Sequence, residues 1–266
     1  MKMLKQWKIY REQKFTSEDF RKCVQLVVWQ YTLTPEKYLS NNLFETYAAA
    51  FTESPWIGTA FKGATSSCAQ VPDIRHYVGN HLAWTKIADQ LGPNHFSGVI
   101  LTGWQRFDHF ASLCELLPVA VPSLKCCAIA LDKKKFDEDD AKGAFEALGI
   151  TNTLPQSHCT FSGLDLFKII SEKFGPTDLA CQEFFNHSDL KTWLNEWQIQ
   201  NKRISPIQSR AIISKAESLL HHVTEIEKDL SFILPKYYSY QTNNEWLCTF
   251  LFPLKSRLND IITKIK

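Results

Sequence analysis

The stretch Gly98-Val-Ile-Leu-Thr-Gly-Trp-Gln-Arg-Phe-Asp-His-Phe110 decides the fold of the first half of the chain. Its start, residues 99–101, is apolar and β-prone, as expected for a strand buried on both faces. The run breaks at Gly103, and the side chains after the break are aromatic or charged: Trp104, Arg106 and Asp108. In α/β barrels, such residues at the carboxyl end of a parallel strand form sites for small polar ligands.

Two interpretations of this stretch are open from the spacing alone. In the first, the indole stacks on the C–H face of a sugar ring, while the guanidinium and the carboxylate bond its hydroxyl groups. In the second, the tryptophan is buried at a strand end beside a surface ion pair. The residues must therefore be considered together with the rest of the chain.

Two further apolar runs precede this strand, at residues 23–29 and 56–61. Helices are expected between the runs, one opened by Pro35 and one by Pro72, because proline is well tolerated at the first helical position. This alternation predicts parallel strands joined by right-handed crossovers, hence an α/β fold. The sequence has no GxGxxG or GxxxxGK[ST] motif, so a nucleotide-binding site gains no support.

Helical periodicity dominates the remainder of the chain. We expect helices at 109–117, 122–131, 137–148, 161–174, 188–202, 206–234 and 243–265. The polar segment 151–160 is typical of a linker. The predicted organisation is an α/β region at 1–150 and a helical C-terminal region at 151–266.

Composition excludes several classes of partner. The chain has 266 residues, 44% hydrophobic composition and a net charge of +2, with no block of basic residues. We therefore expect neither nucleic acid nor a membrane surface as a partner.

The N-terminus has no apolar run typical of a secretory signal, and the eight cysteines form no CxxC motif. Free thiols in the cytoplasm or nucleus are expected.

Four segments, occurring in order, resemble a known family: 54–64, 72–81, 99–109 and 114–124. They are similar to the β-N-acetylhexosaminidases of glycoside hydrolase family 20, and the likeness runs from about Met3 to Ile150. The resemblance implies the C-terminal portion of a TIM (β/α)8 barrel, about strands six to eight, followed by a helical region. It also implies hydrolysis of terminal β-linked N-acetyl-D-hexosamine.

The family's mechanism is retaining and substrate-assisted. The 2-acetamido oxygen of the substrate attacks the anomeric carbon, a Glu protonates the leaving oxygen, and the adjacent Asp orients the acetamide. In the family this Asp-Glu pair follows strand four, whereas the likeness of this chain begins after strand five. The one adjacent Asp-Glu pair, Asp137-Glu138, is expected at a helix start after strand eight. No catalytic residue is therefore assigned, and the chain, as a truncated gene model or partial isoform, is expected to be inactive alone.

The resemblance implies substrate-binding roles for residues after each strand. Trp29 and Tyr31 match the aromatic motif after strand six. Phe61 and Lys62 match the end of strand seven, where other members often carry a Tyr that serves the acetamide. The last group follows strand eight: Trp104 as the aromatic floor, with Arg106 and Asp108 placed to bond ring hydroxyls.

The residues indicate neither a metal nor a cofactor. His76 and His81 lie five positions apart on one predicted helix, too far round it to share a ligand, and no HExxH motif occurs. The expected partner is a glycan or glycoconjugate that contains N-acetylhexosamine. The alternative from another class is a non-catalytic binding or interaction module derived from the hydrolase.

Overall fold

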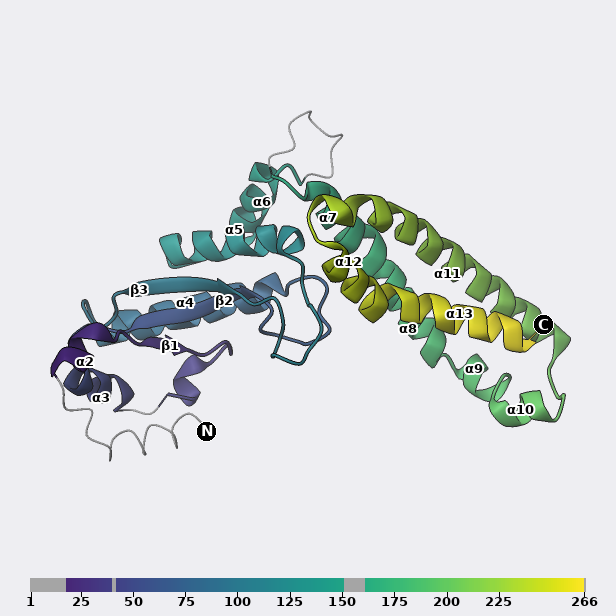
Figure 1. The fold of residues 1–266 in the computed structure, drawn as a ribbon, viewed down its shortest axis with the longest axis horizontal. Coiled ribbons are helices and arrows are strands. Elements are labelled where there is room, and N and C mark those ends of the chain that lie inside the picture. The colour runs from purple at the N-terminus through teal and green to yellow at the C-terminus, as the bar shows by residue number, and fades with distance from the viewer. Residues whose placement is uncertain (1–17, 40–41, 151–160, 266) are drawn as a thin grey trace. The chain divides into compact units, whose positions relative to one another are not determined.

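The computed structural model describes residues 18–39, 42–150 and 161–265 (Figure 1). Their packing forms two compact units. Among the described residues, unit 1 contains those up to Ala64, Asp73–Gly103 and Ser123–Ala141. Unit 2 contains Thr65–Pro72, Trp104–Pro122 and the described residues from Lys142 onward. These units interleave along the sequence, whereas the division at residue 150 remains a prediction and its linker lies outside the described residues.

The sheet of unit 1 has three strands in the order β1 (Val27–Trp29), β2 (Trp56–Lys62) and β3 (Gly98–Gly103). Both pairings are parallel, as predicted. Helix α4 (Ile74–Leu91) connects β2 to β3. The protein is therefore a mixed α/β structure in which helices predominate.

The strand register divides the sheet into two different faces. Val28, Ile57 and Val99 lie side by side, and they form an apolar cluster with Trp84 and Ile87 of α4. Side chains alternate along a strand, so the neighbouring residues point to the other face. That face keeps large apolar side chains exposed: Val27, Trp29 and Ile100.

Helix α4 begins where the sequence predicts. The carboxylate of Asp73 accepts a hydrogen bond from the backbone N–H of His76 at 3.1 Å, which caps the first turn. Tyr77, His81 and Trp84 follow at helical spacing and are all buried. The periodicity of the sequence was therefore sufficient to define this helix.

The helix predicted to run onward from Pro35 is wrong. The structure has a 3-10 turn, η1 (Pro35–Lys37), and then a separate helix, α3 (Leu43–Ala50). The backbone N–H of Tyr38 already bonds back to the carbonyl of Pro35, which closes the tight turn. A short helix, α2 (Glu18–Cys23), precedes the sheet.

The helix predicted at 109–117 is also wrong, because this segment is a loop. The side chain of Asp108 accepts hydrogen bonds from the N–H groups of Phe110 and Ala111, at 2.8 and 3.0 Å. This local turn competes with helix formation, as Asp side chains commonly do. Helix α5 (Leu117–Lys133) begins earlier than predicted and includes Pro122, and α6 (Glu138–Ala147) follows.

Unit 2 is built on helices after residue 160. Its elements are α7 (Leu164–Lys168), the π-helical η2 (Ile169–Phe174), α8 (Gly175–Asn186), α9 (Ser188–Thr192), α10 (Glu196–Gln200), α11 (Pro206–Ile233), η3 (Leu234–Lys236), α12 (Tyr240–Trp246), the π-helical η4 (Leu247–Leu251) and α13 (Phe252–Ile265). Helix α8 was not among the predicted helices. The chain instead stays helical there, with the proline in the first turn of α8.

The core of unit 2 is one large apolar cluster. Helix α11 contributes a stripe of residues three or four positions apart: Ile212, Ala216, Leu219, Val223, Ile226 and Leu230. Helix α13 contributes a matching stripe: Leu254, Leu258 and Ile262. Such stripes are the expected core-facing sides of amphipathic helices.

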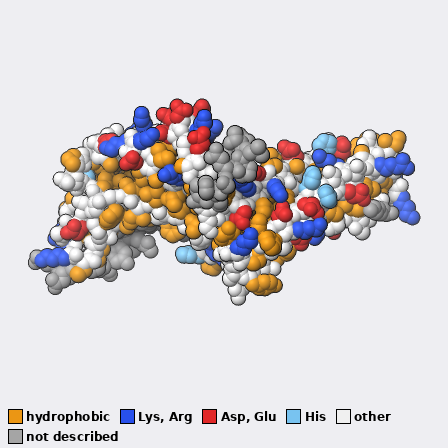
Figure 2. Space-filling view, turned by 90° about the horizontal axis from the view of Figure 1, so that it is seen from above, with side chains coloured by type: hydrophobic (Ala, Val, Ile, Leu, Met, Phe, Trp, Pro, Cys, Tyr) orange, Lys and Arg blue, Asp and Glu red, His pale blue; other side chains and the backbone are white. Residues whose placement is uncertain are grey.

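Charged side chains are distributed over the surface. Figure 2 shows acidic and basic groups interspersed on the face drawn there, in keeping with the small net charge. Within the described ranges, no helix combines the length and the apolar character that crossing a membrane requires.

Candidate functional site at the carboxyl edge of the sheet

Helix α4 holds the backbone that follows β1. The amide nitrogen of Asn80 donates to the carbonyls of Gln30 and Thr32, at 2.8 and 2.6 Å. The indole N–H of Trp84 donates to the same Gln30 carbonyl at 2.9 Å. The His76 ring lies 2.7 Å from the carbonyl of Tyr31, so its Nε2 carries the proton of this bond. Side chains of one helix thus replace the ladder bonds that end with the strand.

This backbone carries the two aromatic residues predicted after β1. The rings of Trp29 and Tyr31 are stacked, with centroids 5.3 Å apart and an interplanar angle of 25°. Trp29 is 48% exposed, so the pair presents apolar surface to solvent. A large exposed aromatic surface beside polar groups is suited to stacking on a ligand.

The end of β2 is irregular. The register against β3 shifts between Ala60 and Lys62, so Phe61 is the additional residue of a bulge. Phe61 and Lys62 are both buried, and the hydroxyl of Ser123 donates to the Phe61 carbonyl at 2.7 Å. Bulges commonly occur beside sites, because they re-aim side chains.

Glycine is required opposite this bulge. A Cβ atom on Gly103 would lie 2.6 Å from the ring of Phe61, closer than two carbon atoms can approach. The predicted break at Gly103 therefore has a packing cause as well as a turn-forming one. Both Phe61 and Gly103 belong to unit 1.

A buried polar network lies behind the strand end. The hydroxyl of Thr59 lies 2.8 Å from Nε2 of His81, whose Nδ1 lies 2.7 Å from the carbonyl of Tyr77. The carbonyl can only accept, so Nδ1 carries the proton of that bond. In the neutral ring Nε2 is an acceptor that faces the Thr59 hydroxyl, which also lies 3.3 Å from the carbonyl of Ile100. Burial lowers the pKa of His81, which favours this neutral form. Tyr77 also accepts, through its hydroxyl oxygen, the N–H of Ala64 at 3.0 Å.

The third group of predicted residues lies on one loop of unit 2. Trp104 directly follows β3 in the chain and is 46% exposed. The guanidinium of Arg106 donates through Nη1 to the carbonyl of Ala111 at 2.8 Å. It also forms a two-pronged ion pair with Glu245 of α12, in which Nη2 lies 2.8 Å from Oε2.

Glu245, far along the sequence, bonds two residues of this loop. Besides Arg106, its carboxylate accepts the backbone N–H of Leu113 at 3.1 Å. The hydrogen bond to Glu245 raises the pKa of Arg106, and the same bond lowers the pKa of the Glu245 carboxyl although burial opposes it. Glu245 was not among the predicted site residues. The one signal for it in the sequence was that a half-buried arginine needs an acidic partner.

The seven predicted substrate residues therefore form three local groups. Trp29 and Tyr31 stack on each other, Phe61 and Lys62 share the bulge of β2, and the remaining three share the loop after β3: Trp104, Arg106 and Asp108. The first two groups belong to unit 1 and the third to unit 2. In the described part of the chain, no three His, Cys, Asp or Glu side chains are grouped so that they could hold a metal ion.

These features define a class of protein: a mixed α/β chain with aromatic and polar side chains at the carboxyl ends of parallel strands. α/β enzymes bind small polar ligands at this edge. The chain is similar to human hexosaminidase D, with 28% identity over 257 residues, which are 94% of this chain and 53% of that protein. It is also similar to hexosaminidase D of cattle, with 36% identity over 141 residues, 53% of this chain and 41% of the relative.

The chain thus spans about half the length of the curated relatives that it matches. No family model matches it.

Proposed function

We propose that the chain is part of a β-N-acetylhexosaminidase, which hydrolyses terminal β-linked N-acetyl-D-hexosamine in glycans or glycoconjugates. The observation that carries the proposal is the similarity to human hexosaminidase D along 94% of the chain. The proposed reaction is the retaining, substrate-assisted one implied by the resemblance to glycoside hydrolase family 20.

We also propose that the sheet corresponds to about strands six to eight of a (β/α)8 barrel. Three consecutive strands that pair in parallel and in chain order support this assignment. The exposed apolar face with Val27, Trp29 and Ile100 supports it as well. In a closed barrel, layers of side chains from all strands fill that face.

The proposal assigns no catalytic carboxylate to this chain. Asp137 and Asp140 cap the start of α6 reciprocally: Asp137 accepts the N–H of Asp140 at 2.9 Å, and Asp140 accepts that of Asp137 at 3.3 Å. Lys133 also pairs with Asp140. This arrangement supports a structural role for Asp137. The isolated chain is accordingly proposed to be inactive.

The proposed role of the chain is to bind the sugar. Trp104 supplies the apolar wall for the ring, and Asp108 accepts hydrogen bonds from its hydroxyls. Trp29 and Tyr31 supply a second aromatic surface. Phe61 and Lys62 lie at the strand end that matches the acetamide side in the family, but both are buried, so no direct contact with the sugar is proposed for them. Arg106 can contribute only the N–H groups that Glu245 and Ala111 leave available.

The proposed location is the cytoplasm or the nucleus. The described cysteines are free thiols, including the adjacent pair Cys126 and Cys127. Burial raises the pKa of Cys126 to about 11 and that of Cys127 to about 12, so both stay protonated. Unreactive free thiols suit a reducing compartment. A glycan or glycoconjugate that contains N-acetylhexosamine, not a nucleic acid or a membrane, is the proposed partner.

Two proteins test the proposed function: the isolated 266-residue chain, and a hybrid in which it replaces the matched portion of human hexosaminidase D. The isolated chain should release no 4-nitrophenol from an aryl N-acetyl-β-galactosaminide above background. The hybrid should release it, because its other portion would supply the general acid and its partner. A hybrid that folds but does not turn over would contradict the hydrolase proposal and favour a non-catalytic binding module.

Substitutions in the hybrid test the sugar-binding residues. Trp104→Ala and Asp108→Asn should each lower kcat/KM by at least about tenfold, or about 1.4 kcal/mol of transition-state stabilisation. Asn keeps an acceptor for the local turn, so this change removes the charge and leaves the loop bonded. Trp193→Ala is the matched control. Trp193 lies in the helical region and is 43% exposed, nearly as much as Trp104 at 46%. Loss of folding in Trp104→Ala, with unchanged activity per folded molecule, would make Trp104 a core residue.

A further inference from the structure

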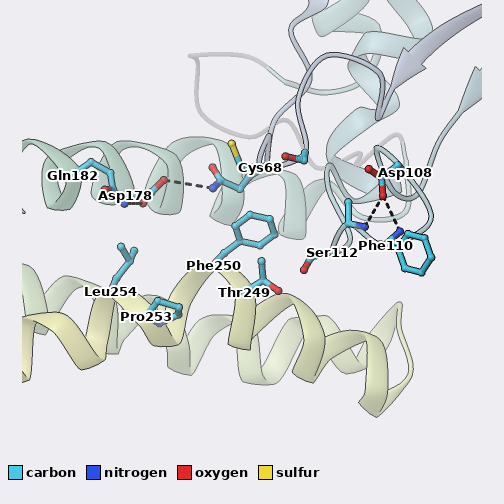
Figure 3. A pocket seen from close by; sticks show the side chains of 13 residues that line it. Cys68, Asp108, Phe110, Ser112, Asp178, Gln182, Thr249, Phe250, Pro253 and Leu254 are labelled. Carbon is cyan, nitrogen blue, oxygen red and sulfur yellow. Dashed lines mark hydrogen bonds between the residues drawn. The ribbon is translucent and has the colours of Figure 1, made fainter.

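Unit 2 contains an open cavity of about 750 Å³ (Figure 3). Of the residues proposed above to bind the terminal sugar, its described lining includes Asp108 alone. Four segments line it: Ser67, Cys68 and Gln70; the loop residues Asp108, Phe110, Ala111 and Ser112; Asp178 and Gln182 of α8; and Thr249, Phe250, Pro253 and Leu254. Its volume lies within the range of small-molecule sites.

The polar groups of the cavity are ordered around Asp178. Gln182 donates through Nε2 to Oδ1 of Asp178 at 3.1 Å (Figure 3). Gln70 donates to Oδ2 of Asp178 at 3.4 Å. These bonds orient both amides, and each amide keeps an acceptor oxygen and a second N–H. Side-chain amides with both functions suit hydroxyl groups, which donate and accept.

The loop wall of the cavity is held in place. Arg106 and Leu113 both bond to Glu245, which fixes the loop at its two ends. The side chain of Asp108 fixes the turn between them. On the opposite wall, Thr249 and Phe250 belong to the π-helical η4, and π-helical turns frequently occur at functional sites. A wall fixed before binding lowers the entropic cost of binding a ligand.

Phe110 lies at the rim of this cavity and is unusually exposed for a phenylalanine. Its side chain is 101% exposed, so packing within the chain does not explain it. The turn made by Asp108 presents it (Figure 3). An exposed aromatic ring beside hydroxyl and amide groups is suited to stacking on the C–H face of a sugar.

The charge of the lining selects among sugars. The lining includes two carboxylates, Asp108 and Asp178, and none of the residues described as lining it is Lys, Arg or His. A carboxylate or sulfate ester on the ligand would meet like charge with no cation to compensate. A neutral sugar would instead find acceptors for its hydroxyl hydrogens.

We propose that this cavity binds a neutral saccharide, the portion of a glycan that follows the terminal N-acetylhexosamine. The inference rests on the proposed function for the identity of the ligand, and on the lining for its neutrality. The cavity thereby makes the helical region a determinant of which glycans are accepted.

Binding to the isolated chain tests the cavity without any need for catalysis. N,N′-diacetylchitobiose, titrated while amide NMR signals are recorded, should shift signals of residues 108–112 and 178–182. Phe110→Ala and Gln182→Ala should raise its Kd about fivefold or more. Phe232→Ala is the matched control, because Phe232 is 73% exposed on α11 and does not line the cavity. Equal affinity in all variants would overturn the proposal.

Charge selection has its own test. The same disaccharide with a sulfate ester on its reducing-end sugar should bind the unaltered chain about tenfold more weakly or worse. Asp178→Asn should reduce this difference, because it removes one of the two repelling charges and keeps the side-chain shape. Equal binding of the neutral and sulfated sugars by the unaltered chain would contradict the assignment.

Hydrolysis by the hybrid separates failure of this inference from failure of the proposed function. A methyl N-acetyl-β-hexosaminide offers only the terminal sugar, because its leaving group is too small to stack on an aromatic ring, whereas the disaccharide also offers the next sugar. Phe110→Ala should lower kcat/KM for the disaccharide about fivefold and leave that for the methyl glycoside unchanged. Turnover of both substrates with an unaltered ratio would overturn the cavity assignment alone. No turnover of either would overturn the proposed function, and the binding titration would still decide the cavity.

Discussion

The two units of the molecule keep their folds by different means. Unit 1 has a small apolar cluster and buries several polar side chains: Thr59, Lys62, Asn80, His81 and Ser123. Unit 2 has one long apolar cluster that runs through its helices. Two of these groups, Asn80 and Ser123, bond the backbone at the strand ends, where ladder bonds stop. Unit 1 therefore holds candidate site segments in place, whereas unit 2 gains most of its stability from apolar packing.

The largest loss of unfolding free energy should come from a substitution that creates a void in the apolar core of unit 2. Leu230→Ala removes a fully buried side chain on α11 and should cost about 2–5 kcal/mol of unfolding free energy. Hydrogen exchange of unit 2 peptides during urea unfolding would measure it. Ile207→Ala, at an exposed position of the same helix, should cost little. A small loss at Leu230 would mean that apolar packing does not dominate unit 2.

A smaller effect is expected from the polar network of unit 1. Asn80→Ala leaves the carbonyls of Gln30 and Thr32 without their donor and should cost about 1–2 kcal/mol. The cost is limited because the variant also removes the buried Oδ1 of Asn80, which has no hydrogen-bond partner. Amide exchange in residues 26–33 should accelerate. Asn80→Asp, which offers acceptors only, should be worse than Ala; the opposite order would refute the donor role.

The Arg106–Glu245 pair should contribute less, because both side chains are partly exposed and solvent screens them. Glu245→Gln keeps an acceptor for the Leu113 N–H and should cost about 0.5–1 kcal/mol at pH 7. Because the folded pKa of Glu245 lies below its ordinary value of 4.5, the contribution is present above that value. It should disappear as the pH falls through the folded pKa.

Exchange of the peptide that contains residues 106–113, measured against pH, would check this expectation. Glu225→Gln is the control, since Glu225 pairs with Lys228 on the surface of α11 and does not contact the loop. A difference between the unaltered chain and Glu245→Gln that grows toward low pH would have the wrong sign for an ion pair.

The smallest effect concerns His81. It should make the unfolding free energy of unit 1 depend on acid pH in a way that unit 2 does not share. Its folded pKa lies below the ordinary 6.5, so the unfolded chain binds the proton first as the pH falls. The unfolding free energy of unit 1 should therefore decline below pH 6.5, and His81→Gln should remove this slope. His222→Gln, on α11, should leave it unchanged. A unit 1 stability that rises on acidification would contradict the neutral, buried state of His81.

Local patterns in the sequence predicted much of this architecture. Apolar, β-prone runs predicted the three parallel strands, because the residues of a strand are neighbours in sequence. The predicted burial of residues 99–101 on both faces is wrong, since Ile100 is 39% exposed. The periodicity of α4 and α11 likewise gave both helices close to their observed bounds. The resemblance in four ordered segments predicted the relationship to hexosaminidases, and the human and bovine relatives bear it out.

Only the tertiary structure decided how the loop after β3 is held and what it faces. Arg106 and Glu245 are 139 positions apart, so no local pattern could pair them. The loop at 109–117 replaces a predicted helix, because the Asp108 side chain and Glu245 satisfy its backbone groups instead. The cavity beside Phe110 likewise assembles four distant segments. Contacts of this kind form only when the chain has folded, since their geometry depends on packing and not on spacing.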